Sequence, residues 1–380
     1  MIGRLRASAA GAVLAVAIGG AARAEEPIDE ITLMPLPAAT PYRVWVSDLA
    51  LNHLVDGKVH IVDGKTGVYQ GVVPMGFIGA TTLSPDGSRF LVATTYYDRG
   101  TRGTKVDVLE SYDTKTLEFQ GEILLPTKRA MALTYGPLAA VTQDGRFALI
   151  QNATPASSVT VVDLGAKKVA SEIDTAGCWA VYPSPSAASR FTTICGDGTF
   201  ETVELSAQGA QASRAKSAQM FDAQNDPIFT TGDHIGDTFY FVTFDGELVA
   251  VDLAAPEAKL VDRWTFVDGV EGNWRPGGYN IVAAHRASGR VFVGMHPNGA
   301  EGSHKTPAQE IWALDPKAKK VLARAPGHNA LALTVNQEGA PLLFASKEGT
   351  GLVALDPDKD LSVVNEMDGL AETALLIEAP

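Results

Sequence analysis

Ser158-Val159-Thr160-Val161-Val162-Asp163 shows the pattern that decides the fold: an alternating strand that ends in an apolar residue, an acid and a turn. The apolar–acid pair recurs at Val62-Asp63, Tyr112-Asp113, Val162-Asp163, Val203-Glu204, Val251-Asp252, Leu314-Asp315 and Leu355-Asp356. The steps between successive acids along the chain are 50, 50, 41, 48, 63 and 41. Seven copies at a spacing of about 49 residues indicate a β-propeller.

Turn-forming residues follow the repeated acids, as in Asp113-Thr114-Lys115-Thr116 and Asp315-Pro316-Lys317, and another strand then begins. Each copy therefore reads as part of an antiparallel hairpin. A pair of β-sandwiches or a solenoid is the alternative, but the spacing is too long for one strand pair and solenoid repeats are shorter. We predict an all-β, seven-bladed β-propeller, with four strands in each blade.

The segment 1–24 has the features of a signal peptide. Arg4 and Arg6 precede an apolar run over 7–22, and Ala22-Arg23-Ala24 has the small-x-small pattern of a cleavage site. The run is short and rich in Ala and Gly for a membrane anchor, which is the alternative. We predict cleavage after Ala24, export from the cytoplasm, and a single propeller domain over 25–380. No later stretch is apolar enough for a membrane span, so we expect no membrane partner.

Charge and cysteine content narrow the partners and the chemistry. The formal net charge of −13 argues against binding to nucleic acid or to anionic membrane surfaces. The chain has two cysteines, Cys178 and Cys195, and neither lies in a CxxC motif or beside a histidine. In an exported protein such a pair usually forms a disulfide. We predict a structural disulfide between them.

No catalytic or metal-binding motif is recognisable. The sequence lacks GxSxG, HExxH, P-loop, EF-hand and Rossmann patterns. His285, His296 and His304 are the densest histidine group, but the spacings between them match no common ligand set. We therefore assign no catalytic residue and no metal ligand to this chain.

The longest interval of the repeat, between Asp252 and Asp315, contains an insertion with the residue types of a protein interface. Aromatic and basic residues gather there, and such residues are enriched at interfaces. Packing of a long loop against its own blade is an equally good explanation of the same composition. The predicted partner interface consists of Trp274, Arg275, Tyr279, His304 and Lys305.

Several strings resemble the heavy chain of the quinoprotein amine dehydrogenases. They are residues 98–107, 177–183, 191–198, 219–221, 274–280, 285–290 and 304–306, and the likeness extends from about Ile61 to the C-terminus. The cysteine-bearing segments look closer to the aromatic amine dehydrogenase branch than to the methylamine branch. The resemblance is therefore to a family that includes both.

The resemblance implies a periplasmic heterotetramer of two heavy and two light chains. The light chain of the family carries tryptophan tryptophylquinone, made from two of its own tryptophans, together with the catalytic base. Primary amines are oxidised to aldehydes with release of ammonia, and electrons pass to a blue-copper protein such as amicyanin or azurin. The heavy chain seats the light chain and shapes its substrate channel, so no cofactor is expected in this chain.

One position departs from the family pattern. An aromatic residue of the first blade's loop reaches towards the active site in the family, whereas the matching stretch 47–54 offers only the imidazole of His53. We assign His53 to the substrate channel; the alternatives are that a neighbouring residue takes this place or that the channel differs. A changed amine preference is consistent with each of them. The alternative function is a stand-alone periplasmic propeller that binds or scaffolds without redox activity. A hydrolytic propeller is a third and less favoured hypothesis.

Overall fold

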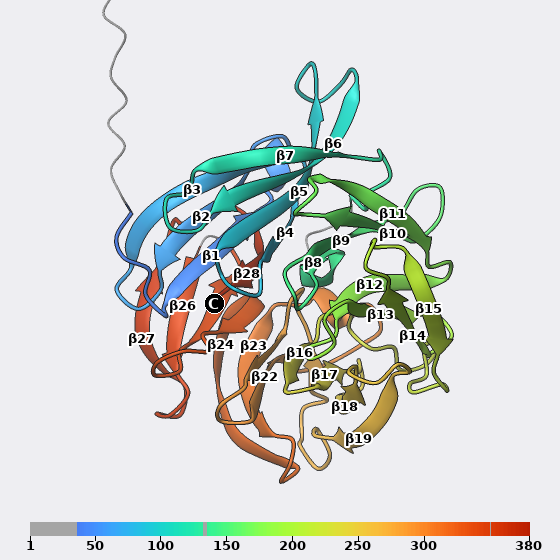
Figure 1. The fold of residues 1–380 in the computed structure, drawn as a ribbon. Coiled ribbons are helices and arrows are strands. Elements are labelled where there is room, and N and C mark those ends of the chain that lie inside the picture. Colours follow the sequence, from blue (N-terminus) through green and yellow to red (C-terminus); the bar gives the residue numbers. More distant parts are fainter. Residues whose placement is uncertain (1–35, 132–134, 350) are drawn as a thin grey trace, which may run out of the picture. The chain divides into compact units, whose positions relative to one another are not determined.

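The computed structural model describes residues 36–131, 135–349 and 351–380, so the predicted signal peptide lies outside the described residues. Residues 36–380 form one compact unit in which antiparallel sheets are arranged as a ring (Figure 1). Helix in the described ranges is confined to three 3-10 turns: η1 (Leu51–His53), η2 (Gly136–Leu138) and η3 (Ser303–Lys305). None of them is long or apolar enough to cross a membrane.

The C-terminal strand closes the ring. Strand β28 (Ala374–Glu378) pairs with β1 (Arg43–Asp48), and β2 (Gly57–Asp63) and β3 (Val68–Gly76) complete this first blade. The first and last strands of the unit therefore share one sheet. Closing the ring in this way leaves only the short, protected sheet edges of a propeller.

Four further blades follow in chain order, each made of four consecutive antiparallel strands. The second blade is β4 (Ala80–Leu83), β5 (Arg89–Tyr97), β6 (Lys105–Asp113) and β7 (Phe119–Leu125). The third is β8 (Ala139–Val141), β9 (Phe147–Asn152), β10 (Ser158–Asp163) and β11 (Lys168–Asp174). The fourth is β12 (Cys178–Pro183), β13 (Arg190–Cys195), β14 (Phe200–Leu205) and β15 (Gln211–Lys216). The fifth is β16 (Asp233–Ile235), β17 (Thr238–Val242), β18 (Glu247–Asp252) and β19 (Lys259–Thr265).

The remaining strands form one eight-stranded sheet rather than two separate blades. Its strands are β20 (Arg275–Pro276), β21 (Val282–His285), β22 (Arg290–His296), β23 (Ala308–Asp315), β24 (Lys320–Val335), β25 (Leu343–Lys347), β26 (Gly351–Asp356) and β27 (Ser362–Met367). The predicted β-propeller is confirmed, but the prediction of seven separate blades is wrong: the described residues show five.

The long strand β24 is the physical reason for the difference. Its 16 residues pair with β23 from Lys320 to Pro326 and again at Ala330, and with β25 from Ala330 onwards, so one strand joins both halves of the sheet. Between these two regions, His328 and Asn329 have φ values of 53° and 54°. This left-handed backbone bends the strand without ending it.

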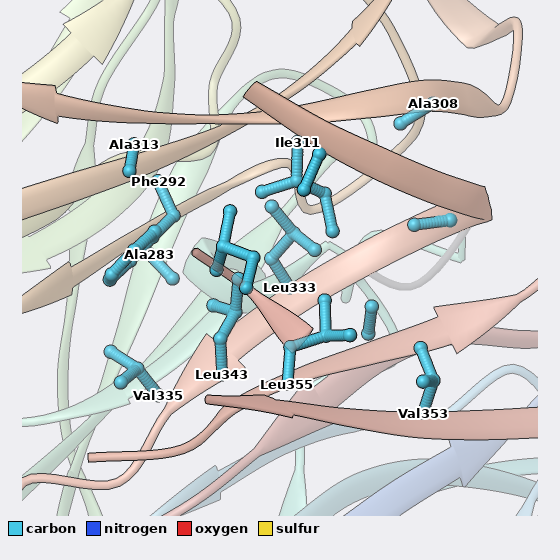
Figure 2. Packing of buried hydrophobic residues seen from close by; sticks show 14 residues of the cluster. Ala283, Phe292, Ala308, Ile311, Ala313, Leu333, Val335, Leu343, Val353 and Leu355 are labelled. Carbon is cyan, nitrogen blue, oxygen red and sulfur yellow. The ribbon is translucent and has the colours of Figure 1, made fainter. Parts of the chain in front are cut away.

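Burial decreases from the centre of the ring outwards. Strand β9, second in its blade, is buried at all six positions, whereas β15, the outermost strand of the next blade, is mostly exposed. Apolar side chains from neighbouring strands of the eight-stranded sheet pack into one buried cluster. Figure 2 shows this for Phe292, Ile311, Leu333, Leu343 and Leu355. The fold is held by sheet-to-sheet burial of this kind, since the described residues contain no long helix.

The repeated acids hold turns at one end of the blades. Each lies at or next to the end of the third strand of its four-stranded repeat. The carboxylates of Asp63, Asp113, Asp163, Asp252, Asp315 and Asp356 accept hydrogen bonds from backbone N–H groups two or three residues later. Glu204 instead pairs with Arg190 at 2.6 Å. The motif therefore has a structural role at a turn.

Strand order places the other loops at the opposite end. In a four-stranded antiparallel blade, the loop between the second and third strands and the connection to the next blade share one end. We call this end the connection face, and it contains the loops 49–56, 98–104, 217–232, 266–281 and 297–307. The end that contains the turns after the repeated acids is called the turn face.

Candidate functional site

The largest cavity found among the described residues lies on the connection face and has a volume of about 750 Å³. It is open to solvent and lies among the loops 217–232, 243–246, 266–281 and 297–307. Tyr135, from the connection that leads into the third blade, also lines it. Its lining residues are Tyr135, Gln224, Asn225, Pro227, Ile228, Phe229, Thr230, Phe244, Asp245, Arg275, Gly278, Tyr279, Gly299, Ala300, Glu301, Gly302 and His304. The lining combines aromatic side chains with a few charged groups, as is typical of binding sites.

Three of the five predicted interface residues meet at this cavity. Arg275, Tyr279 and His304 line it, although His304 comes from a different loop than the other two. Lys305 lies beside them, with its ammonium 5.7 Å from the centre of the Tyr279 ring. The structure therefore brings together residues from two loops that are well separated in the sequence. Their role as a partner interface stays a prediction.

An ion pair joins two loops at the cavity. Nε of Arg275 lies 3.0 Å from Oδ1 of Asp245, and Nη1 of Arg275 donates to the carbonyl oxygen of Trp274. Asp245 belongs to the β17–β18 turn, whereas Arg275 begins the first strand of the next sheet. The pair is partly exposed, with 22% of the Arg275 side chain and 54% of the Asp245 side chain accessible. It therefore places a partly exposed charged pair at the rim of the cavity.

Aromatic and neutral groups line the inner side of the cavity. The rings of Tyr135 and Tyr279 have centroids 6.2 Å apart. Burial, followed by the nearby Tyr279 hydroxyl, raises the pKa of Tyr135, so this phenol stays protonated at neutral pH. Burial, followed by the charge of Lys305, lowers the pKa of His304 below its usual value. The imidazole is therefore neutral at pH 7 and can accept as well as donate hydrogen bonds.

Trp274 packs against its own sheet. Its Nε1 donates to the carbonyl oxygen of Glu271, and its ring lies 5.6 Å from that of the fully buried Trp312. The Arg324 guanidinium lies 4.7 Å from the Trp274 ring and 4.5 Å from the Trp312 ring. Trp274 therefore packs against its own part of the chain, which is the alternative to an interface role that the sequence left open. Its contact with a partner stays a prediction.

His53 lies on the connection face but is not one of the cavity's lining residues. It ends η1 and is exposed, and its side chain makes no hydrogen bond to the described residues. The loop around it is fixed: the Asn52 amide donates to Glu372 at 2.5 Å, and the Asp48 carboxylate accepts from the backbone of Ala50 and Glu372. The structure thus presents His53 to solvent on a fixed loop, and its assignment to a substrate channel stays a prediction.

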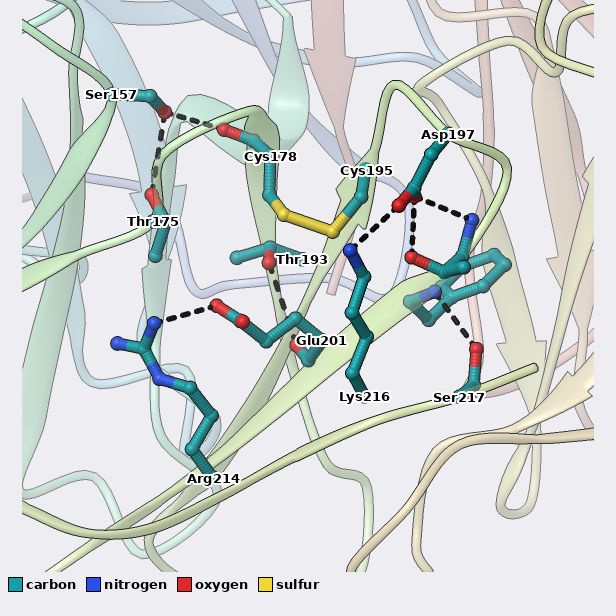
Figure 3. The surroundings of a disulfide bond; sticks show 12 residues. Ser157, Thr175, Cys178, Thr193, Cys195, Asp197, Glu201, Arg214, Lys216 and Ser217 are labelled. Carbon is teal, nitrogen blue, oxygen red and sulfur yellow. Dashed lines mark hydrogen bonds and ion pairs between the residues drawn. A yellow bond between two sulfur atoms is a disulfide. The ribbon is translucent and has the colours of Figure 1, made fainter. Parts of the chain in front are cut away.

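The predicted disulfide is present. Cys178 of β12 and Cys195 of β13 face each other on neighbouring strands and are bonded, as Figure 3 shows. Both are buried, with 5% and 2% exposure. Near the connection face, this bond joins the first two strands of the fourth blade. Its role is structural, because neither sulfur is available as a thiol.

The three histidines considered as metal ligands do not share a site. His285 ends β21 at the turn face and contacts the Ser288 hydroxyl at 2.8 Å, whereas His296 ends β22 at the opposite end. The Nε2 of His296 lies 3.3 Å from the Ser303 hydroxyl. Within 36–131, 135–349 and 351–380, no group of three His, Cys, Asp or Glu side chains is arranged to hold a metal ion.

Sequence reasoning missed several cavity residues. Tyr135, Phe229 and Phe244 come from three different connections and have no motif of their own. One signal could have pointed to Phe229, because the connection 217–232 that contains it is long. Connections between blades all lie on one face of a propeller, so this loop could have been placed beside the insertion. The insertion between Asp252 and Asp315 was therefore one contributor to the site among several.

Fold and site together define an all-β propeller protein with an open cavity on its connection face. The chain belongs to the methylamine dehydrogenase heavy chain family, because the family model described as "Methylamine dehydrogenase heavy chain (MADH)" matches residues 40–374. The match covers the first blade, the cavity and most of the ring. The family-level resemblance predicted from the sequence is confirmed.

Curated relatives agree with the family match. The methylamine dehydrogenase heavy chain of Methylorubrum extorquens is 29% identical over 357 residues, which is 91% of this chain and 84% of that protein. The heavy chain of Paracoccus versutus is 28% identical and covers 85% of this chain and 75% of its own. That of Methylophilus methylotrophus is 26% identical, with 92% and 86% covered. These relatives are named for methylamine, and the closer likeness of the cysteine-bearing segments to the aromatic amine branch stays a prediction.

Among solved structures, the chain is similar to dihydro-heme d1 dehydrogenase NirN in complex with DHE. The TM-score is 0.56 at 16% identity, and the match covers 90% of this chain and 78% of that one. An identity this low indicates a shared fold and carries no argument about chemistry.

Proposed function

We propose that this chain is the heavy subunit of an amine dehydrogenase and that its connection face seats a light chain. The observation that carries the proposal is the cavity of about 750 Å³, which gathers Arg275, Tyr279 and His304 on one face of a chain that belongs to this family. An exposed surface with aromatic anchors and a charged rim has the anatomy of a protein interface. The stand-alone propeller is the less favoured alternative, because the curated relatives are subunits named as heavy chains.

The proposed complex oxidises primary amines to aldehydes with release of ammonia. Tryptophan tryptophylquinone, carried by the light chain, supplies the redox chemistry when it is present. This chain's own close tryptophan pair, Trp274 and Trp312, packs ring against ring and both rings contact the Arg324 guanidinium, which suits a structural role and not a crosslinked cofactor. The contribution of this chain is to bind the light chain, to orient it and to limit access to it.

The proposal includes the surroundings of the enzyme. We place the complex in the periplasm, as a heterotetramer of two heavy and two light chains, with electrons leaving to a blue-copper protein such as amicyanin or azurin. His53, on its fixed loop, would shape access for the amine. The predicted leader over 1–24 and the disulfide between Cys178 and Cys195 support an oxidising compartment.

The architecture of the scaffold is also part of the proposal. Strand β24 is the outer strand of one half of the eight-stranded sheet and the inner strand of the other. Each half also contains one copy of the repeated motif, at Asp315 and at Asp356. We infer that the two halves act as two propeller repeats joined without a break, so that the ring has the repeat number that the motif predicts.

Co-expression with the light chain tests the proposed activity. The purified complex should reduce a redox dye when a primary amine is added, and methylamine and an aromatic amine should be compared directly. The heavy chain alone should show no turnover and serves as the control. A fully matured complex that is inert towards both aliphatic and aromatic amines would contradict the proposal.

A further inference from the structure

A two-stranded ribbon leaves the ring on the connection face. Strand β5 pairs with β4 only as far as Ala93, and β6 pairs with β7 only from Asp107 onwards. Beyond these points, Tyr96 pairs with Val106 and Tyr97 with Lys105 without a third strand beside them, whereas at the base the Thr95 carbonyl oxygen still accepts from the Phe77 N–H. Figure 1 shows this hairpin standing out beyond the rest of the second blade. An isolated hairpin is only marginally stable in water, so its shape needs support from elsewhere.

A buried cluster of polar groups supplies that support at the base of the ribbon. The Thr95 hydroxyl donates to Asp107 at 2.6 Å and accepts from Nε of Arg129 at 2.9 Å. The Arg129 side chain is 1% exposed and also donates to the carbonyl oxygens of Phe77 and Ile78. Lys105 adds an ion pair to Asp107 at 3.0 Å. These bonds tie both strands of the ribbon to the neighbouring loops and fix its direction.

The tip of the ribbon is basic and exposed. Arg99 and Arg102 stand against one acid, Asp98, in a short stretch of a chain whose net charge is −13, whereas Lys105 is paired with Asp107 at the base. The Arg99 side chain is 71% exposed, and its 3.6 Å pair with Asp98 is too open to solvent to neutralise it strongly. Arg102 has no ion-pair partner among the residues that the structure describes.

The tip also has a defined shape. Oδ1 of Asp98 accepts from the backbone N–H of Thr104, and the Arg99 N–H donates to the Arg102 carbonyl oxygen. Gly100 and Gly103 have φ values of 73° and 100°, which the tight reversal requires and which other residues rarely adopt. Two arginines are thus held at the end of a braced ribbon, where little side-chain or loop ordering is left for a partner to impose.

We propose that the ribbon Thr94–Val106 is a docking arm that contacts an acidic surface of the light chain seated on the connection face. The inference rests on the proposed function, because the partner is assigned from the face on which the arm stands. A positive arm on an otherwise acidic chain attracts a negatively charged partner, and it speeds association and fixes orientation more than it adds contact area. Arginine suits this role, since its guanidinium binds carboxylates in two parallel hydrogen bonds.

The test is a charge reversal at the arm. Heavy chain with Arg99→Glu and Arg102→Glu is compared with heavy chain carrying Lys115→Glu and Lys167→Glu, which change the charge equally at exposed turn-face sites. Binding to matured light chain is measured by surface plasmon resonance at low and high salt. At low salt we expect the arm variant to bind about tenfold or more weakly, mainly through a slower association rate, and the difference should shrink at high salt because salt screens the new repulsion. The control should bind like the unsubstituted protein.

A milder pair, Arg99→Gln and Arg102→Gln, should show an intermediate loss, and thermal melts should be unchanged because both side chains are exposed. Equal light-chain binding by the arm and control variants would overturn the proposal. So would a change confined to heavy-chain self-association, measured by sedimentation, because the arm would then serve a second copy of this chain. If unsubstituted heavy chain fails to bind the light chain at any salt concentration, the proposed function itself fails and the arm proposal falls with it.

Discussion

Nε of Arg275 lies 3.0 Å from the carboxylate of Asp245 and links the β19–β20 connection to the β17–β18 turn at the cavity. Because both side chains remain partly exposed, the pair contributes little to folding stability. The same exposure leaves the guanidinium available to a partner. We therefore regard it as a binding group held in position by Asp245.

The first prediction concerns this arginine. Arg275→Gln should weaken light-chain binding about tenfold, as truncation of a central interface arginine often does, while the free energy of unfolding changes by less than about 1 kcal/mol. Calorimetric titration and urea unfolding measure the two quantities. Arg190→Gln, which removes the Arg190–Glu204 pair at the turn face, is the control and should leave binding unchanged. An equal loss of light-chain affinity in both variants would show that light-chain binding does not depend on the connection face.

A second prediction concerns the disulfide of the fourth blade. Replacing both Cys178 and Cys195 with alanine opens a loop with a sequence separation of 17. The loss should be about 3 kcal/mol of unfolding free energy. Urea unfolding with and without a reducing agent measures it: reductant should lower the midpoint of the natural protein to that of the double variant. If the reductant shifts the urea midpoint of both proteins equally, or shifts neither midpoint, the disulfide does not stabilise the fold.

A third prediction concerns the pH dependence of stability through Glu378. This residue of β28 lines a cavity along the axis of the ring, and burial, opposed by hydrogen bonds from Thr81 and Leu83, raises its pKa to about 7. The unfolded value is about 4.3, so the folded state favours the protonated form. The stabilising contribution is complete below about pH 4, decreases as the pH rises and is lost above about pH 7.

Glu378→Gln keeps the shape of the neutral acid and removes the titration. Its melting temperature should match that of the natural protein at low pH and exceed it at pH 8. Thermal melts at several pH values give this difference, and Glu257→Gln, at an exposed position, is the matched control. A difference between natural protein and Glu378→Gln that does not vary with pH would rule out titration of this carboxyl as the cause.

A fourth prediction concerns amine preference. His53 is exposed on a fixed loop of the connection face, so shortening it should widen access without disturbing the fold. In the matured complex, His53→Ala should raise kcat/KM for a bulky aromatic amine relative to methylamine several-fold. Steady-state assays with both amines give the ratio, and Lys317→Ala at the turn face is the control. An unchanged ratio would remove His53 from the substrate channel.

Much of the fold follows from the sequence because the repeated acid has a local cause. Asp113 and Asp315 hold turns through their own neighbours' backbone N–H groups, so each copy can be recognised without tertiary information. The number of separate blades does not follow in the same way. The motif counts third-strand turns, whereas a sheet is divided or joined by backbone pairing. At His328 and Asn329 the chain bends and continues pairing, and no local residue pattern distinguishes this from a break.

The site was predictable only in part for a related reason. Arg275, Tyr279 and His304 stood out because an insertion lengthens one repeat interval. Tyr135 reaches the same cavity from the connection 126–138 and Phe244 from a short turn within the fifth blade, and only the closed ring brings them there. Tryptophan is a residue type enriched at interfaces, yet the Trp274 ring packs against Arg324 and Trp312. These residues lie on strands far from Trp274 in the sequence, so the contact could not be read from it.

The central claim is that the connection face seats the light chain, and hydrogen–deuterium exchange of the heavy chain with and without matured light chain tests it most directly. Peptides covering 224–230, 273–279 and 300–305 should exchange more slowly in the complex, together with the ribbon tip 98–104. Peptides covering the turns 63–67 and 113–117 should be unaffected. Protection confined to the turn face, or no protection in a complex that forms, would contradict the account.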